Sequence, residues 1–145
     1  MLQKIGFWNI RGAHLEIKLV QAKQIISDNN LGIFGILETK LNFDLTLKAA
    51  NLINPHWSVH HNLVEAPYGR IMVLSDPTFY TLTPIISHKQ FIHFHALHLP
   101  TTTSFYLTFI YGENHVAARQ DMLNYLPHLR QETYPLFVLG DLIVC

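Results

Sequence analysis

Two apolar segments separated by an amphipathic one most strongly limit what the N-terminal part of this chain can fold into. The segment KIGFWNI (4–10) has the composition of a buried strand, and Arg11 and Gly12 close it. Between residues 14 and 30, apolar side chains recur at helical spacing, and Asn29, Asn30 and Gly32 mark the end of the helix. LGIFGIL (31–37) has the length and flanks of a second buried strand. This order predicts a parallel β-α-β crossover with the helix on one face of a sheet.

Further along the chain, short apolar segments joined by polar or proline-containing residues predict antiparallel hairpins. The predicted strands are 57–64, 70–75, 78–86, 91–99 and 104–112. One helix is expected to be capped by Asp44 and to run to Ile53, and another begins at Val116 and is kinked or split by Pro127. PLFVLG (135–140) gives the last strand. No repeat or linker divides the chain, so we expect one unit of mixed α/β type.

The low charge of the chain suggests that part of its surface is covered. Charged residues make up 14% and hydrophobic residues 49%, whereas soluble domains usually carry roughly 25% charged residues. More of the same domain, a partner chain or a large core could each provide the cover. Ten basic residues balance ten acidic ones, so the formal net charge is zero at pH 7. The chain therefore has no overall field that would attract a polyanion.

No segment has the features of a targeting sequence or a membrane span. The first ten residues lack the apolar block and cleavage site of a secretory signal. No apolar run approaches the roughly 18 residues that cross a bilayer. The single cysteine, Cys145, excludes an internal disulfide and is compatible with a reducing compartment. We therefore expect an intracellular protein, in the nucleus or cytoplasm, without a membrane partner.

Three of the predicted strands lead directly into a polar side chain: Asn9, Glu38 and Asp141. The carboxyl ends of strands in α/β sheets are where side chains leave the core and ligands bind. Oxygen donors of this kind suit Mg²⁺. Each residue also has a simpler explanation, because Asn9 can turn the chain before Gly12, Glu38 can pair with Lys40, and Asp141 can be a turn residue. The three together favour a ligand site.

Four segments in this order resemble the endonuclease/exonuclease/phosphatase superfamily: IGFWNIRG, LGIFGILETK, LTFIYG and FVLGD. Within the superfamily, the chain is similar to the endonuclease domain of plant LINE-type (non-LTR) retrotransposons. The segment GRIMVLSDP and the helix near Arg119 are also similar to that group. The resemblance implies a partial four-layer α/β sandwich. Residues 1–145 would form its N-terminal half to two-thirds, with the first mixed sheet and flanking helices present and the second sheet largely missing. An exposed apolar sheet face would then favour self-association.

The resemblance also implies roles for single residues. Glu38 matches the metal-binding glutamate and Asn9 an asparagine near the metal and the scissile phosphate, so Mg²⁺ or Mn²⁺ is implied. Tyr111 matches a tyrosine that contacts the phosphate, and Asp141 the aspartate that orients or activates the attacking water. Arg119 lies where the family often has an arginine, although a solvated helix residue is the simpler interpretation.

Two departures from the family pattern affect the expected activity. Ile143 stands where the family motif has an asparagine, and no counterpart of the later Ser-Asp-His motif is present. Because positioned charges dominate catalysis of phosphoryl-type transfer, their loss should lower the rate by orders of magnitude. The leading hypothesis is a truncated, inactive or severely impaired metal-dependent phosphodiesterase of retrotransposon origin that resembles a DNA endonuclease. The alternative is a non-catalytic remnant, or a module that binds nucleic acid or a partner weakly.

A histidine-rich strand and a basic loop are further candidates for binding. In FIHFHALHL, His93 and His95 share one strand face and His98 the opposite one. A zinc site would need a third ligand, so a histidine-rich metal module is the weakest hypothesis and solvated strand-face histidines are expected. The segment Tyr68-Gly69-Arg70 can contact a phosphate backbone, or can simply form a hairpin turn that exposes Arg70.

Overall fold

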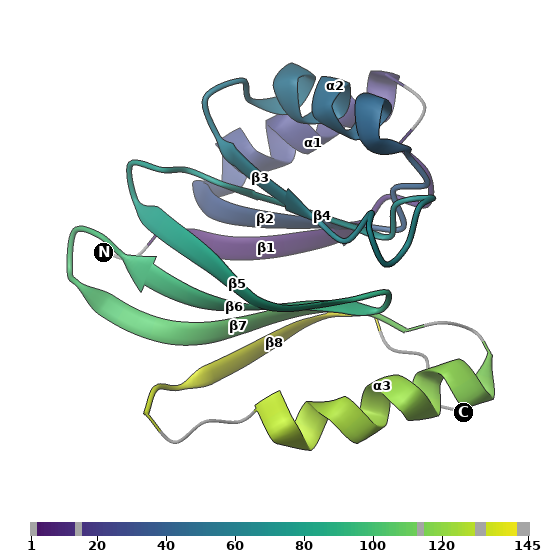
Figure 1. Cartoon of the computed structure of the whole chain (residues 1–145). Coiled ribbons are helices and arrows are strands. Elements are labelled where there is room, and N and C mark those ends of the chain that lie inside the picture. Colours follow the sequence, from purple (N-terminus) through teal and green to yellow (C-terminus); the bar gives the residue numbers. More distant parts are fainter. Residues whose placement is uncertain (1–2, 14–15, 113–114, 130–132, 142–145) are drawn as a thin grey trace.

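The computed structural model describes residues 3–13, 16–112, 115–129 and 133–141 (Figure 1). The strands in these ranges are β1 (Lys4–Asn9), β2 (Leu31–Leu37), β3 (Ser58–His61), β4 (Ile71–Ser75), β5 (Tyr80–His88), β6 (Phe91–His98), β7 (Thr103–Tyr111) and β8 (Leu136–Asp141). The helices are α1 (Glu16–Asn29), α2 (Phe43–Ile53) and α3 (Val116–Leu129). Figure 1 shows two sheets face to face, with α1 and α2 outside the first and α3 outside the second. The predicted mixed α/β class and partial sandwich are confirmed.

The first sheet has the strand order β1-β2-β4-β3. Strands β1 and β2 are parallel and joined by α1, so the predicted crossover is confirmed. Strand β4 runs antiparallel to both β2 and β3. Every residue of β2 is buried, because the helices cover one face of the strand and the second sheet covers the other. The last residues of the two parallel strands, Asn9 and Leu37, are paired in register.

The second sheet has the order β5-β6-β7-β8 and is complete enough to cover the first. Strands β5, β6 and β7 are antiparallel, as the hairpin pattern predicted. Helix α3 then leads to β8, which runs parallel to β7 and pairs Tyr111 with Asp141. The expectation that a second sheet is largely missing is therefore wrong. Short apolar segments predicted each strand, but the sheet that each strand joins depends on contacts across the sandwich.

Those contacts form the core between the two sheets. Ile33 of β2 and Val73 of β4 pack in one cluster with Phe94 of β6 and Phe109 of β7. The sheets approach closely at Gly35, where an added side chain would overlap the ring of Phe109. The inner face of the first sheet is thus covered within the chain, which removes the physical reason for the expected self-association through an exposed sheet face.

The cap of α2 differs from the prediction, and Pro127 does not split α3. Asn42, not Asp44, caps α2, because the Asn42 side chain accepts a hydrogen bond of 3.0 Å from the Leu45 backbone N–H. Asp44 lies in the first turn, where its negative charge interacts favourably with the positive end of the helix dipole. Helix α3 includes Pro127 and ends two residues later, at Leu129. None of the helices in the described part of the chain is long and apolar enough to span a membrane.

Candidate functional site

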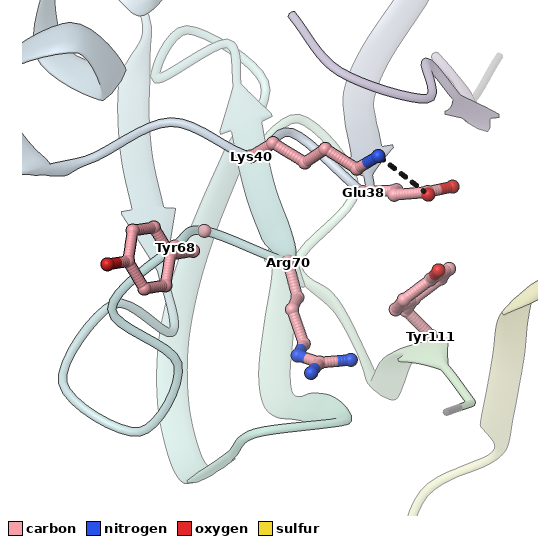
Figure 2. A pocket seen from close by; sticks show the side chains of 6 residues that line it. Glu38, Lys40, Tyr68, Arg70 and Tyr111 are labelled. Carbon is pink, nitrogen blue, oxygen red and sulfur yellow. Dashed lines mark ion pairs between the residues drawn. The ribbon is translucent and has the colours of Figure 1, made fainter. Parts of the chain in front are cut away.

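A cavity of about 440 Å³ lies where the end of β2 in the first sheet meets the end of β7 in the second (Figure 2). The residues that line it are Glu38, Lys40, Tyr68, Gly69, Arg70 and Tyr111. Two residues predicted for the site, Glu38 and Tyr111, are therefore brought together. The basic loop singled out in the sequence contributes three further residues to the same cavity.

The backbone around Glu38 adopts a conformation that is unusual for residues with a side chain. Glu38 has φ +57° and Lys40 has φ +56°, and left-handed residues of this kind cost on the order of 1–3 kcal/mol each. The neighbouring chain holds them in place. The Glu38 N–H donates to the Arg70 carbonyl at 2.5 Å, and the Glu38 carbonyl accepts from the Gly12 N–H at 2.7 Å. Strain that is fixed from both sides in this way is typical of a functional position.

Lys18 on α1 fixes the loop that follows β1. Its ammonium group donates to the carbonyl oxygens of Ile10, Gly12 and Arg11 at 2.9, 3.2 and 3.4 Å. Because Gly12 in turn donates to the Glu38 carbonyl, Lys18 supports the cavity without lining it. This role could not be read from the sequence, since a lysine on an amphipathic helix has no local feature that distinguishes it from a solvated one.

Buried Asn62 organises the loop between β3 and β4. Its side-chain oxygen accepts from the Ile71 N–H at 3.1 Å, and its amide donates to the carbonyls of His88 at 3.0 Å and Lys89 at 3.2 Å. The last two residues belong to the β5–β6 hairpin region, so one side chain joins the two sheets. The role of Asn62 could not be read from the sequence either, because its partners His88 and Lys89 are distant along the chain.

Gly69 joins this loop to the segment after β2. Its carbonyl oxygen accepts from the Thr39 hydroxyl at 2.9 Å and from the Lys40 N–H at 2.8 Å. Gly69 has φ +51°, and a side chain there would overlap the Leu41 carbonyl oxygen and the Thr39 hydroxyl. Only glycine meets both requirements without strain. Gly69 therefore fixes the backbone of the segment that carries Tyr68 and Arg70 against the segment that carries Glu38.

The two cationic side chains of the cavity each contact another residue that lines it, Lys40 a carboxylate and Arg70 an aromatic ring. Lys40 Nζ lies 3.6 Å from Glu38 Oε1, with the two side chains 61% and 22% exposed. The predicted surface pairing of Glu38 is thus present, on a carboxylate that also lines the cavity. The Arg70 guanidinium carbon lies 5.9 Å from the centre of the Tyr111 ring, within the range of a cation–π contact. Figure 2 shows Lys40 directed at Glu38, and Arg70 between Tyr68 and Tyr111.

The other two predicted site residues lie at the same edge of the sandwich. Asn9 is paired with Leu37, next to Glu38, and is not among the residues that line the cavity. Its side-chain oxygen accepts a 3.1 Å hydrogen bond from the Arg11 N–H, which is the turn role given as its simpler explanation. Asp141 is placed by its backbone, as the register partner of Tyr111. Ile143 and Cys145 lie outside the described residues.

The interpretation of Arg119 as a solvated helix residue is wrong. Its exposed fraction is 8%, because it lies on the same face of α3 as Met122 and Leu129, which pack against Phe91 of the second sheet. Arg119 is therefore buried between the helix and the sheet.

The strand-face histidines are also more buried than expected. His93 and His98 lie on opposite faces of β6, as predicted, but each is only 1% exposed. His93 Nδ1 lies 2.7 Å from the Thr108 hydroxyl, and His98 Nε2 lies 2.8 Å from the side-chain oxygen of Gln3. Burial lowers the pKa of His93. Within the described ranges no group of three or more His, Cys, Asp or Glu could hold a metal ion, so nothing here supports a histidine-rich metal module.

The arrangement of two packed sheets with outer helices is the fold of the endonuclease/exonuclease/phosphatase proteins, and solved structures of that family match the chain closely in shape. No protein-family model and no curated protein sequence matches it. An endonuclease/exonuclease/phosphatase family protein from Bacteroides thetaiotaomicron has 14% identity and a TM-score of 0.64, with 94% of this chain and 62% of that chain covered.

Two further solved structures, a phosphatase and an endonuclease domain, are similar to the chain. The mannosyl-6-phosphatase Bt3783 of Bacteroides thetaiotaomicron has 13% identity and a TM-score of 0.68, over 97% of this chain and 65% of that one. The endonuclease domain of TRAS1, a telomere-specific non-LTR retrotransposon, has 10% identity and a TM-score of 0.70, over 93% and 58%. The chain thus spans less than two-thirds of the length of each structure. At these identities the likeness shows the fold.

Proposed function

We propose that the cavity binds a phosphodiester and that the chain carries a divalent-metal phosphodiesterase site of the DNA endonuclease type. The observation that carries the proposal is the meeting of Glu38, Arg70 and Tyr111, from three separate segments, in one cavity at the strand ends. A carboxylate, a guanidinium and a phenol together suit a phosphate with an accompanying metal ion. The fold of the phosphatase and the retrotransposon endonuclease described above supports the same class of substrate.

A divalent metal ion fits the donors present. Glu38 offers a partly exposed carboxylate and Asn9 an amide oxygen one strand away. Mg²⁺ or Mn²⁺ needs only one or two such protein oxygens, because water and the phosphate complete its coordination. When bound, the ion would supply Lewis-acid stabilisation of the charge on the phosphoryl oxygens.

The chain's own residues would then position the substrate. Arg70 donates hydrogen bonds to a non-bridging phosphate oxygen, which a guanidinium can do in bidentate fashion. The Tyr111 hydroxyl donates to the same phosphate, and its ring is held by the Arg70 contact. Asp141, the register partner of Tyr111, orients the attacking water and accepts its proton.

Binding without hydrolysis is the second candidate function. It is favoured by the absence, among the residues that the structure describes, of any group of three or more His, Cys, Asp or Glu that could hold a metal. A single carboxylate supports anion binding through a metal ion more readily than it supports a complete catalytic centre. In this candidate, the cavity recognises a phosphodiester and leaves it intact.

Nicking of supercoiled plasmid DNA distinguishes the two candidates. The wild type, Glu38→Ala and Glu16→Ala would be compared in Mg²⁺, in Mn²⁺ and in EDTA; Glu16 is an exposed glutamate on α1 that is not among the residues that line the cavity. We expect metal-dependent nicking that Glu38→Ala abolishes and Glu16→Ala retains. Nicking that persists in Glu38→Ala would overturn the assignment of Glu38. DNA binding without nicking in any metal would support the second candidate.

We also propose that the chain is of retrotransposon origin. This origin is supported by the four sequence segments that resemble LINE-type endonucleases and by the shared fold with the TRAS1 domain. Sequencing the nucleotides beyond the codon of Cys145 tests it. A segment that encodes the Ser-Asp-His motif is expected there, and unrelated sequence would count against this origin.

A further inference from the structure

Tyr68 presents an aromatic ring to solvent at the edge of the cavity. The residue is 84% exposed and lines the same cavity as Arg70 and Tyr111. No hydrogen bond or ring contact of Tyr68 is found among the described residues, whereas most of the other tyrosines pack against neighbouring rings. Most of the Tyr68 side chain is therefore available to a ligand that enters the cavity.

The loop that carries Tyr68 is held rigidly on both sides. Before it, the Asn62 carbonyl accepts from the N–H groups of Glu65 and Ala66 at 3.1 and 2.8 Å. After it, Gly69 donates to the Ala66 carbonyl at 2.9 Å and is bonded through its own carbonyl to Thr39. An exposed ring on a fixed backbone loses little conformational entropy when a ligand covers it. The fixed backbone therefore presents the exposed Tyr68 ring where a planar ligand can stack on it.

We propose that Tyr68 and Arg70 form a subsite for single-stranded nucleic acid, in which Arg70 binds a backbone phosphate and Tyr68 stacks on the base of the adjoining nucleotide. The subsite rests on the proposed function, because it places the phosphate in the same cavity. Arg70 follows Tyr68 by two residues and both line the cavity, with the Tyr68 ring directed away from the Arg70 guanidinium (Figure 2). A strand that crosses this short segment can therefore meet the cation on one side and the ring on the other. The base must be unpaired, since a duplex hides the faces of its bases in the stack.

This subsite makes the substrate class more specific than a phosphodiester. A phosphorylated sugar can occupy the Arg70 side of the cavity but has no aromatic face for Tyr68. Stacking of a base on an aromatic side chain typically changes the affinity by about tenfold when the ring is removed. The ring should matter more than its hydroxyl, so phenylalanine should replace Tyr68.

Fluorescence anisotropy in EDTA tests the subsite without catalysis. The full chain would be titrated onto a labelled eight-nucleotide oligothymidylate and onto a labelled abasic oligonucleotide of the same length, which has the same phosphates but no bases. We expect the wild type and Tyr68→Phe to prefer the base-bearing strand by about tenfold. Tyr68→Ala should lose that preference. Arg70→Ala should weaken binding of both strands, and Lys23→Ala, which removes an exposed charge on α1, should leave the preference intact.

Equal binding of the two strands by the wild type, or a preference that survives in Tyr68→Ala, would overturn the subsite. No measurable binding of either strand would overturn it as well. These outcomes are independent of the nicking assay, because EDTA prevents any metal-dependent reaction. A chain that shows the base preference but never nicks DNA would keep the subsite and lose the catalytic proposal. Nicking without a base preference would give the reverse result.

Discussion

The buried hydroxyl of Thr39 donates a hydrogen bond of 2.9 Å to the carbonyl oxygen of Gly69, 30 residues further along the chain. This bond joins the segment that carries Glu38 to the loop that carries Tyr68 and Arg70. Because all of these residues but Thr39 line the cavity, the shape of the site depends on a contact between two residues with no chemical role of their own.

Replacing Thr39 by valine should lower the free energy of unfolding by about 1 kcal/mol, the usual net value of a buried hydrogen bond. Thr46→Val is a matched control. Thr46 is equally buried, and no partner for its hydroxyl is found among the described residues. Its replacement should be neutral or stabilising, because it removes an unsatisfied polar group. Urea unfolding measures both, and equal destabilisation would contradict the assigned role of Thr39.

Gly69→Ala should destabilise the protein by roughly 2 kcal/mol or more, because alanine is strained at φ +51° and its Cβ would overlap backbone and side-chain oxygens. Gly6→Ala is the comparison, since the nearest atom to an added Cβ there is a flexible Leu31 methyl at 3.1 Å. Chemical denaturation would give both values. A change at Gly69 no larger than that at Gly6 would show that the loop adapts.

Lys40→Met should increase the affinity for Mn²⁺ by up to about fivefold, the range expected for an exposed ion pair. The reason is that Lys40 Nζ shares the Glu38 carboxylate at 3.6 Å with any bound cation. Electron paramagnetic resonance of free Mn²⁺ measures the affinity directly. Lys48→Met on α2 controls for the loss of one exposed charge, and Glu38→Gln should remove binding. Unchanged affinity in Lys40→Met would mean that the metal does not bind at Glu38.

Stability should fall below about pH 6.5 because of His93. Burial lowers the pKa of His93 in the folded chain, so the unfolded chain, with a histidine pKa near 6.5, binds the proton first. The stabilisation is complete above that pH and is lost as the pH falls toward the folded pKa, by at most about 1.4 kcal/mol per pH unit for one group. The buried Nε2 of His93, for which no partner is found among the described residues, explains the direction.

His93→Gln should therefore make the loss of stability in acid shallower, as followed by thermal unfolding between pH 5 and 8. His60 and His61 also have lowered pKa values through burial, so part of the slope should remain. His56→Gln, at an exposed position before β3, is the control. A slope that is the same in His93→Gln and in the wild type would show that this histidine does not titrate with unfolding.

The sequence predicted those features that neighbouring residues decide among themselves. The β-α-β crossover follows from periodicity, and the ends of β1, β2 and β8 follow from the first polar residue after an apolar run. For the same reason the order of residues alone was enough to name Glu38 and the Tyr68-Gly69-Arg70 loop as candidates, whereas Tyr111 was named only through the resemblance to a known family. Strand ends and turns are local features, and polar side chains that can bind a ligand are often found there.

Only the tertiary structure decided how these pieces meet. Packing of Phe94 and Phe109 against β2 and β4 divides the strands into two sheets, which alternation along a strand cannot specify. Asn62 contacts carbonyls 26 and 27 residues away, and Arg119 and His93 are buried by elements distant in sequence. The polar residues at the strand ends were readable from the chain because local order sets them. The cavity that gathers them was not, because long-range packing and hydrogen bonds hold it together.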